Sequence, residues 1–246
     1  MFSRRIEHIC LLVSTALILA GCFHLLVFLI DGGPWEGPVS WRKPATFGLS
    51  FGLTLLTVTW VTSYLRIGDR ARTALLGVFA ADCVVEVAGI TVQAWRGVPS
   101  HFNMETPVNQ AIAMTLAAGG AILIVVLVAL SVYALRGDPA QSPSMRLALR
   151  TGFATMLIAL ASGAGMIARG VTLVNTGQQQ LAYQVGGFLK PLHGVSLHGL
   201  LVLPAVAWLV ARTGWSEAAR TRAVAVAAGG YGLAMVVALV VSVMSM

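Results

Sequence analysis

The stretch AIAMTLAAGGAILIVVLVALSVYAL, residues 111–135, contains 25 residues and no charged side chain. About 20 consecutive apolar residues in a helix cross the roughly 30 Å hydrocarbon core of a bilayer. This stretch therefore predicts a membrane-spanning helix rather than the core helix of a soluble domain.

Further apolar blocks of similar length lie on both sides of it, and the chain of 246 residues is 57% hydrophobic and 10% charged. A soluble domain would carry about 25% charged residues. We therefore predict an all-α polytopic membrane bundle of seven transmembrane helices, with 1–246 as a single transmembrane domain. The expected spans are about 8–30, 44–65, 72–95, 110–135, 150–168, 191–211 and 222–244. The Gly- and Gln-rich stretch 169–190 is expected to be a loop or a re-entrant segment.

The N-terminal segment partly resembles two kinds of export signal. Ser3-Arg4-Arg5 is similar to part of a twin-arginine signal, and Leu19-Ala20-Gly21-Cys22 is similar to a lipoprotein cleavage box. The apolar run continues through Ile30 for about 22 residues, which is longer than a signal-peptide core. We therefore expect an uncleaved first helix.

The net charge of +7 reports topology rather than nucleic-acid binding. Eleven basic residues fall on one side of the seven-span arrangement: Arg4, Arg5, Arg66, Arg70, Arg72, Arg136, Arg146, Arg150, Arg212, Arg220 and Arg222. Five fall on the other: Arg42, Lys43, Arg96, Arg169 and Lys190. Cytoplasmic loops carry the excess of basic residues, which predicts the N-terminus inside and the C-terminus outside. The 14 Arg against 2 Lys suggest a GC-rich bacterial genome, and hence a multi-pass protein of a bacterial plasma membrane.

Two of the expected spans begin and end alike, which suggests an internal repeat. Lys43-Pro44 is followed by Gly52, and Lys190-Pro191 is followed by Gly199, at an offset of 147 residues. A shift of 147 residues places the first three expected spans close to the last three. We therefore consider a 3+1+3 arrangement of parallel repeats over 8–95 and 150–244, joined by the helix at 110–135. Parallel repeats occur in transporters. The alternative is that Lys-Pro often opens a helix at a membrane interface, because proline suits the first helical turn.

The third expected span carries ionisable residues where hydrocarbon is expected. Asp82 and Glu86 are four residues apart, and Gly89, Gln93 and Arg96 continue the same helix face. A charged group inside a membrane costs several kcal/mol, so such a stripe must face the bundle interior and is a candidate functional site.

Four of the five histidines fall in the expected outer half. His24 is about 9 Å below the outer end of its helix, Glu86 about 14 Å, and His198 about 10 Å, so these three share a depth. His101 lies in an outer loop and His193 about 3 Å deep, where both are placed to cap the group. We predict a site open to the outside with Glu86, His101, His193 and His198 at its core. Around it we place Asp82, His24, Arg96, Asn103 and Lys190.

Carboxylates and imidazoles are the ligands that Zn, Fe or Cu prefer, and paired histidines ligate haem. The first hypothesis is a metal or haem site with hydrolytic or redox chemistry on a lipid or small molecule. In it His101, His193, His198 and His24 are metal ligands, Glu86, Asp82 and Arg96 are catalytic, and Asn103, Lys190, Arg42 and Trp41 bind substrate. The second hypothesis is a proton-coupled small-molecule transporter built on the 3+1+3 repeat. Structural polar packing is the third, because a lone intramembrane histidine is often an interhelical hydrogen-bond partner.

Two features near the second expected span have simple structural interpretations. Gly48 and Gly52 form a GxxxG pattern, which predicts a close contact between helices. The loop Trp35–Pro44 mixes tryptophans with cations, which is typical of an interfacial anchor belt. The alternative for this loop is a lid that presents positive charge to an anionic substrate.

Three segments carry a family resemblance. Trp41–Phe47, Arg96–Asn103 and His193–Pro204 resemble a group of bacterial membrane proteins of unknown function, over most of the chain. The resemblance implies the seven-helix membrane fold and no particular activity.

A catalytic pattern also occurs in part. Trp41-Arg42, Ala161-Ser162-Gly163 and His198-Gly199 resemble, in order, the motifs of rhomboid intramembrane serine proteases. The chain has Ala-Ser-Gly where those proteases have Gly-x-Ser-Gly, so we do not expect this activity.

Overall fold

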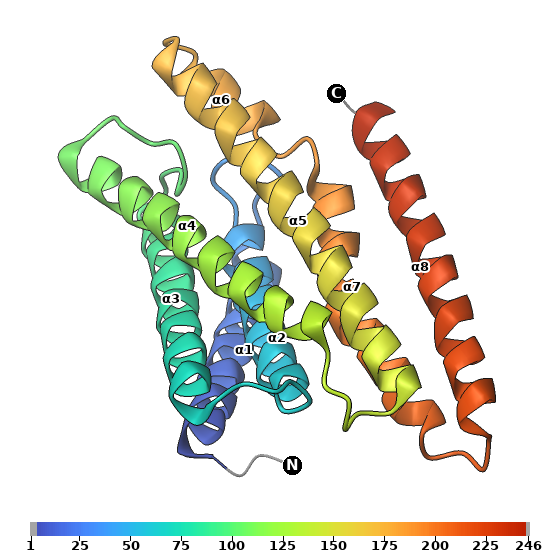
Figure 1. Cartoon of the computed structure of the whole chain (residues 1–246). Coiled ribbons are helices and arrows are strands. Elements are labelled where there is room, and N and C mark those ends of the chain that lie inside the picture. Colours follow the sequence, from blue (N-terminus) through green and yellow to red (C-terminus); the bar gives the residue numbers. More distant parts are fainter. Residues whose placement is uncertain (1–3, 245–246) are drawn as a thin grey trace. The chain divides into compact units, whose positions relative to one another are not determined.

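The computed structural model describes residues 4–244, and the elements in that range are eight helices. Their bounds are α1 Arg5–Asp31, α2 Arg42–Thr62, α3 Asp69–Trp95, α4 Pro107–Arg136, α5 Pro143–Asn175, α6 Gln179–Val185, α7 Lys190–Val210 and α8 Glu217–Met244 (Figure 1). All except the short α6 are long and apolar enough to cross a membrane. The predicted all-α fold with seven candidate spans is confirmed, and the protein is a multi-pass membrane protein.

The fifth span is longer than predicted. We expected 150–168, whereas α5 covers Pro143–Asn175 and is followed by the seven-residue helix α6. The prediction followed the apolar run, which Arg146 and Arg150 interrupt at one end and Arg169 at the other. A helix continues past the hydrocarbon because it satisfies its own backbone hydrogen bonds, whatever its side chains.

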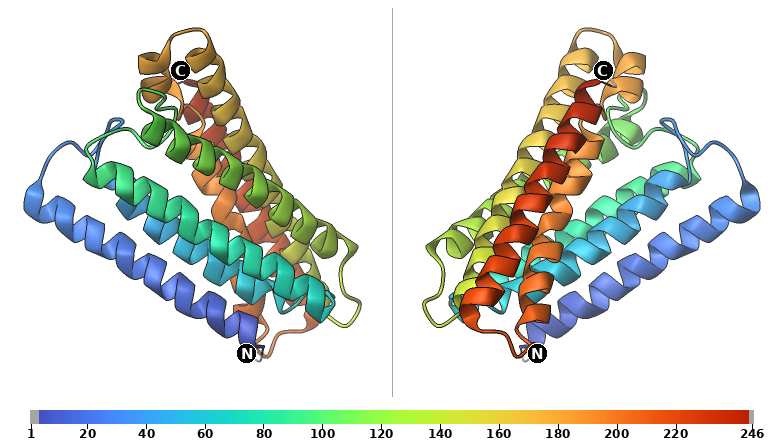
Figure 2. Two further views of the ribbon diagram at one scale, coloured as in Figure 1. Left: turned by 90° about the vertical axis from the view of Figure 1, so that its left-hand side faces the viewer. Right: turned by 90° about the vertical axis from the view of Figure 1, so that its right-hand side faces the viewer.

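The chain divides into two compact units, and the helices α2, α3, α4 and α5 each contribute residues to both. Unit 1 holds the segment up to Thr59, Thr73–Val126 and Ile167–Gly186. Unit 2 holds Trp60–Arg72, Leu127–Met166 and the segment from Gly187 on. In unit 1, α1, α2 and α3 run side by side (Figures 1 and 2).

Glycines bring α1 and α2 of unit 1 into backbone contact. A β-carbon on Gly48 would lie 2.7 Å from Gly21 Cα and 2.9 Å from Leu17 O. A β-carbon on Gly52 would lie 2.8 Å from Ser14 O. The predicted close contact at the GxxxG pattern is therefore confirmed.

A second glycine contact holds unit 2 together. Gly199 on α7 lies against the Thr155 hydroxyl of α5, and its β-carbon would lie 2.9 Å from Cε1 of Tyr231 on α8. The Tyr231 hydroxyl donates to Val195 O at 2.6 Å, and α7 packs along α8 (Figure 2). One small residue thus lets three helices converge.

Candidate functional site

Asp82 and Glu86 form a buried pair of carboxyl groups on α3, which we call the carboxyl pair. The two residues are 7% and 3% exposed. Both side chains face α4 at Gly119, where a β-carbon would lie 2.7 Å from Asp82 Oδ1 and 2.5 Å from Glu86 Oε1. The predicted burial of these two acids is confirmed. Gly119 was not predicted, although a Gly-Gly step in an apolar helix often marks a close approach.

The carboxyl pair is short of hydrogen-bond partners. Asp82 Oδ2 and Glu86 Oε1 are buried and accept no hydrogen bond from the part of the chain that the structure describes, and neither side chain forms an ion pair there. An isolated buried carboxylate costs far more free energy than a neutral polar group, and an ionised neighbour adds repulsion. Such a pair is stable when it holds a proton or cation in place of a protein partner.

A polar cluster lies two turns further along α3, and we call it the amide network. Gln93 Nε2 donates to Asn109 Oδ1 at 3.2 Å, and Arg96 Nη1 donates to Gln93 Oε1 at 2.5 Å and to Asn109 Oδ1 at 2.8 Å. Gln93 and Asn109 are buried, whereas Arg96 is exposed. The cluster therefore connects the interior of unit 1 to its surface. Asn109 was missed, although it lies in the first turn of α4, the helix that follows α3.

Apolar side chains separate the carboxyl pair from the amide network. Gly89 lies between them on α3, and a β-carbon there would lie 2.9 Å from Leu116 Cδ2 and 3.6 Å from Ile112 Cγ2. Leu116 is 3% exposed. The space that the glycine leaves on α3 is therefore filled by side chains of α4.

Both ring nitrogens of His24 have partners. Nδ1 lies 2.7 Å from Ala20 O, and the Trp95 indole N–H donates to Nε2 at 3.1 Å. This pattern fixes the neutral tautomer with the proton on Nδ1, because a carbonyl can only accept. The Trp41 ring stacks on the imidazole with centroids 6.3 Å apart. In this arrangement His24 has no lone pair left for a metal, and it joins α1 to α3.

His101 is half-buried in the loop between α3 and α4. Its Nδ1 lies 2.9 Å from the Ser100 hydroxyl, and its ring lies 5.9 Å from that of Phe47. Burial, and then the positive charge of Lys43, lower the pKa of His101 from 6.5 to about 4. The imidazole is therefore neutral at pH 7.

The low pKa of His101 predicts acid-sensitive stability. Between pH 6.5 and 4 the unfolded chain binds a proton at this residue that the folded chain does not, so stability falls as pH falls. By pH 5 the loss is about 2 kcal/mol. We expect His101→Gln, which keeps a hydrogen-bonding group beside Ser100, to lack this loss when unfolding in detergent is measured at pH 7 and 5. His8→Gln, at an exposed position, keeps the wild-type dependence, and equal pH dependence in all three proteins contradicts the assignment.

His193 of unit 2 pairs with a backbone carbonyl. Its Nδ1 lies 2.8 Å from Ala159 O and 3.3 Å from the Ser162 hydroxyl, which itself donates to Ala159 O at 2.8 Å. The proton on Nδ1 is used by the carbonyl, so this nitrogen cannot act as a base toward Ser162. His198 is exposed, and its Nδ1 lies 2.7 Å from Gly194 O of its own helix. Neither histidine is therefore placed to act as a general base toward Ser162, as a serine protease would require.

The predicted substrate-binding residues at the start of α2 bind other parts of unit 1. The Arg42 guanidinium pairs with Glu36 at 3.1 Å and donates to Trp35 O at 2.9 Å. The Trp41 indole N–H donates to Asp31 at 2.8 Å. These contacts fold the loop before α2 back on itself.

The other two predicted substrate-binding residues also have local contacts. Asn103 is fully buried, and it donates to Pro99 O at 3.3 Å while its Oδ1 accepts from the Glu105 N–H at 3.1 Å. Lys190 begins α7 in unit 2, and its side chain lies against Gly187. Asn103 therefore shapes the loop that carries His101.

The loop between α3 and α4 is held in place by Phe102, which the sequence did not single out. Phe102 adopts a φ of 62°, which is uncommon for a residue with a bulky side chain. Its ring lies against Gly170 of α5 and 3.3 Å from where a β-carbon on Gly186 would be. The Phe102 ring thus packs against glycines of two other segments of unit 1.

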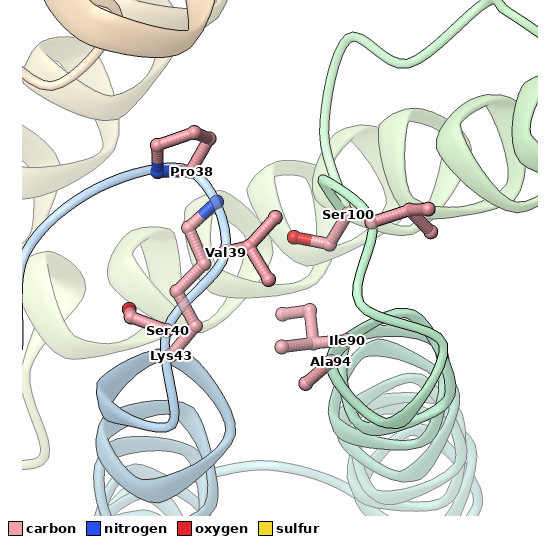
Figure 3. Close-up of a pocket in the computed structure, with 8 residues that line it drawn as sticks. Pro38, Val39, Ser40, Lys43, Ile90, Ala94 and Ser100 are labelled. Carbon is pink, nitrogen blue, oxygen red and sulfur yellow. The ribbon is translucent and has the colours of Figure 1, made fainter. Parts of the chain in front are cut away.

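A small crevice lies between the loop before α2 and the loop after α3 (Figure 3). Its lining residues are Pro38, Val39, Ser40, Lys43, Ile90, Ala94, Val98 and Ser100. The gaps between its atoms add up to about 170 Å³, open solvent included, but they leave no room for a water-sized sphere. We therefore assign no ligand to this crevice.

The predicted core residues are divided between the units. Glu86 and His101 belong to unit 1, and His193 and His198 belong to unit 2, so their meeting at one site stays a prediction. Within residues 4–244, no group of three or more His, Cys, Asp or Glu side chains is arranged to hold a metal ion. The hypothesis of a metal or haem site gains no support from this arrangement.

Comparison with protein-family models, curated proteins and solved structures finds no match to the chain. This agrees with the expectation of no close match to a characterised protein.

Proposed function

We propose that the protein is a proton-coupled membrane transporter for a small molecule and that the carboxyl pair is its proton-binding site. The observation that supports this is the burial of two unpartnered carboxyl groups, Asp82 and Glu86, against the backbone of Gly119. Acids placed this way bind a proton because ionising both in a water-poor interior costs several kcal/mol. Proton relays of pumps and transporters use such intramembrane acids.

The repeat and the orientation are parts of the same proposal. Gly52 and Gly199 are 147 residues apart, and each lies in a close contact with the preceding long helix, α1 in one case and α5 in the other. This similarity supports a 3+1+3 arrangement with α4 as the linking helix. The arginine distribution supports an N-terminus in the cytoplasm and a C-terminus outside.

The two proposed repeats differ at the carboxyl pair. The offset of 147 places Gly229 and Leu233 of α8 where Asp82 and Glu86 stand on α3. Proton binding is therefore assigned to the first repeat alone, and the second has no acid at either position.

Infrared spectroscopy of the purified protein tests the proposal. A protonated carboxyl group in an apolar environment has a carbonyl stretching band that an ionised one lacks. We expect wild type at neutral pH to show this band, Glu86→Gln to weaken it strongly, and Asp82→Asn with Glu86→Gln to remove it.

Glu36→Gln is the matched control, because Glu36 is exposed and paired with Arg42. It leaves the band unchanged. A wild-type spectrum that equals that of the folded double variant would sink the proposal, because the pair then holds no proton.

A further inference from the structure

The facing sides of α3 and α4 are polar at two levels and apolar between them. From the loop inward, α4 places Asn109, Ile112, Leu116 and Gly119 opposite α3 residues Gln93, Gly89, Glu86 and Asp82. The spacings on both helices, of three or four residues, keep each set on one face. A continuous seam therefore runs from the amide network to the carboxyl pair.

The apolar part of this seam is short. Glu86 and Gln93 are seven residues apart on α3, which is about 10 Å along the axis. In the opposite direction, the nearest polar residue on α3 is Thr73, about 14 Å from Asp82. Two fully buried apolar side chains, Leu76 and Phe79, lie between them. On α3, the amide network is thus the nearer polar contact of the pair.

We propose that Leu116 is the gate through which the carboxyl pair exchanges protons with solvent, along a path that passes the amide network. The inference rests on the proposed function and names the route and the residue that controls it. Leu116 fills the space at Gly89, so a rotation of this one side chain opens room beside the glycine. Water admitted there has the Glu86 carboxyl on one side and the amide network on the other, and the roughly 10 Å between them takes more than one water molecule. Glu86 passes its proton to that water, and further water molecules carry it as hydronium to bulk solvent beside Arg96, while the amide and guanidinium groups only hydrogen-bond to these waters. The reverse steps return a proton from solvent to Glu86.

Hydrogen–deuterium exchange of the carboxyl group measures the gate directly. Deuteration shifts the infrared band of a protonated carboxyl group to lower frequency. The purified protein is transferred into D₂O, and the rate at which the band shifts gives the exchange rate of the carboxyl proton. We expect the carboxyl proton of Leu116→Ala to exchange about tenfold faster than that of wild type. The reason is that local opening no longer requires movement of a packed side chain. Leu116→Val, a smaller truncation, gives an intermediate rate and serves if the alanine variant does not fold.

Leu130→Ala is the matched control on the same helix. Leu130 is fully buried and lies eleven residues beyond Gly119, so its truncation leaves the exchange rate unchanged. Equal rates in wild type and both Leu116 variants, with the carboxyl band present, reject the gate and leave the proton-binding proposal standing. Equal acceleration by Leu130→Ala also rejects it, because general loosening then explains the effect. A wild-type protein without the band rejects the proton-binding proposal itself.

Discussion

Replacing Gly48 by alanine is expected to destabilise the protein by about 3 kcal/mol or more. The added methyl would lie 2.7 Å from Gly21 Cα and N and 2.9 Å from Leu17 O, which are backbone atoms of α1. Backbone atoms inside a helix cannot rotate away as a side chain can, so α1 and α2 must separate. The free energy of unfolding in mixed detergent micelles measures the loss.

The control for this experiment is Gly229→Ala on α8. No atom lies within 4 Å of the added methyl at Gly229, and alanine is the better helix former by about 1 kcal/mol. We therefore expect this variant to be as stable as wild type or slightly more stable. If Gly48→Ala matched it, the backbone contact between α1 and α2 would be absent from the folded protein.

Replacing Gly119 by alanine is expected to cost about 2 kcal/mol and to depend on Glu86. The methyl would lie 2.5 Å from Glu86 Oε1 and 2.7 Å from Asp82 Oδ1. These oxygens end flexible side chains, but both are buried and have little room to move. In a Glu86→Ala background the first of the two contacts is gone, so the same substitution costs less.

A double-mutant cycle measures this dependence. We expect the interaction energy between Gly119→Ala and Glu86→Ala to lie between about 0.5 and 3 kcal/mol, as for residues in contact. Gly120→Ala is the control, because its added methyl meets no atom within 4 Å. Strict additivity of the Gly119 and Glu86 substitutions means that the carboxyl pair does not face α4 at this glycine.

Much of the carboxyl-pair region was predictable from the residue pattern on α3. Asp82, Glu86 and Gln93 recur at helical spacing inside an apolar block, and an unfavourable transfer to lipid requires their burial. A second pattern, the small residues Gly48 and Gly52 at helical spacing, predicted a close helix contact, which is the one between α1 and α2. The partners of these residues were harder to predict, because the Gly-Gly step at Gly119 and the amide of Asn109 identify no neighbour until the face of α4 that meets α3 is known.

The hydrogen-bond partners of the histidines, by contrast, were not predictable from the sequence. Similar depth in the membrane suggested that His24 and His198 belong to one site, since depth follows from position along a helix. Rotation about the helix axis does not follow from depth, and it decides which partner a side chain reaches. His24 meets Trp95 and Ala20, and His198 meets the backbone of its own helix.

The sequence alone therefore determined the number of spans and the burial of Asp82, Glu86 and Gln93. Both follow from local quantities, namely the length of each apolar run and the free energy of moving a side chain into hydrocarbon. The tertiary structure alone decided the partner of each buried group, such as Gly119 beside the carboxyl pair and Leu116 over Gly89. The reason is that the apolar faces of membrane helices are about as hydrophobic as one another and as the lipid around them. Hydrophobicity therefore does not select which helices pair, and close packing between particular pairs decides which residues become neighbours.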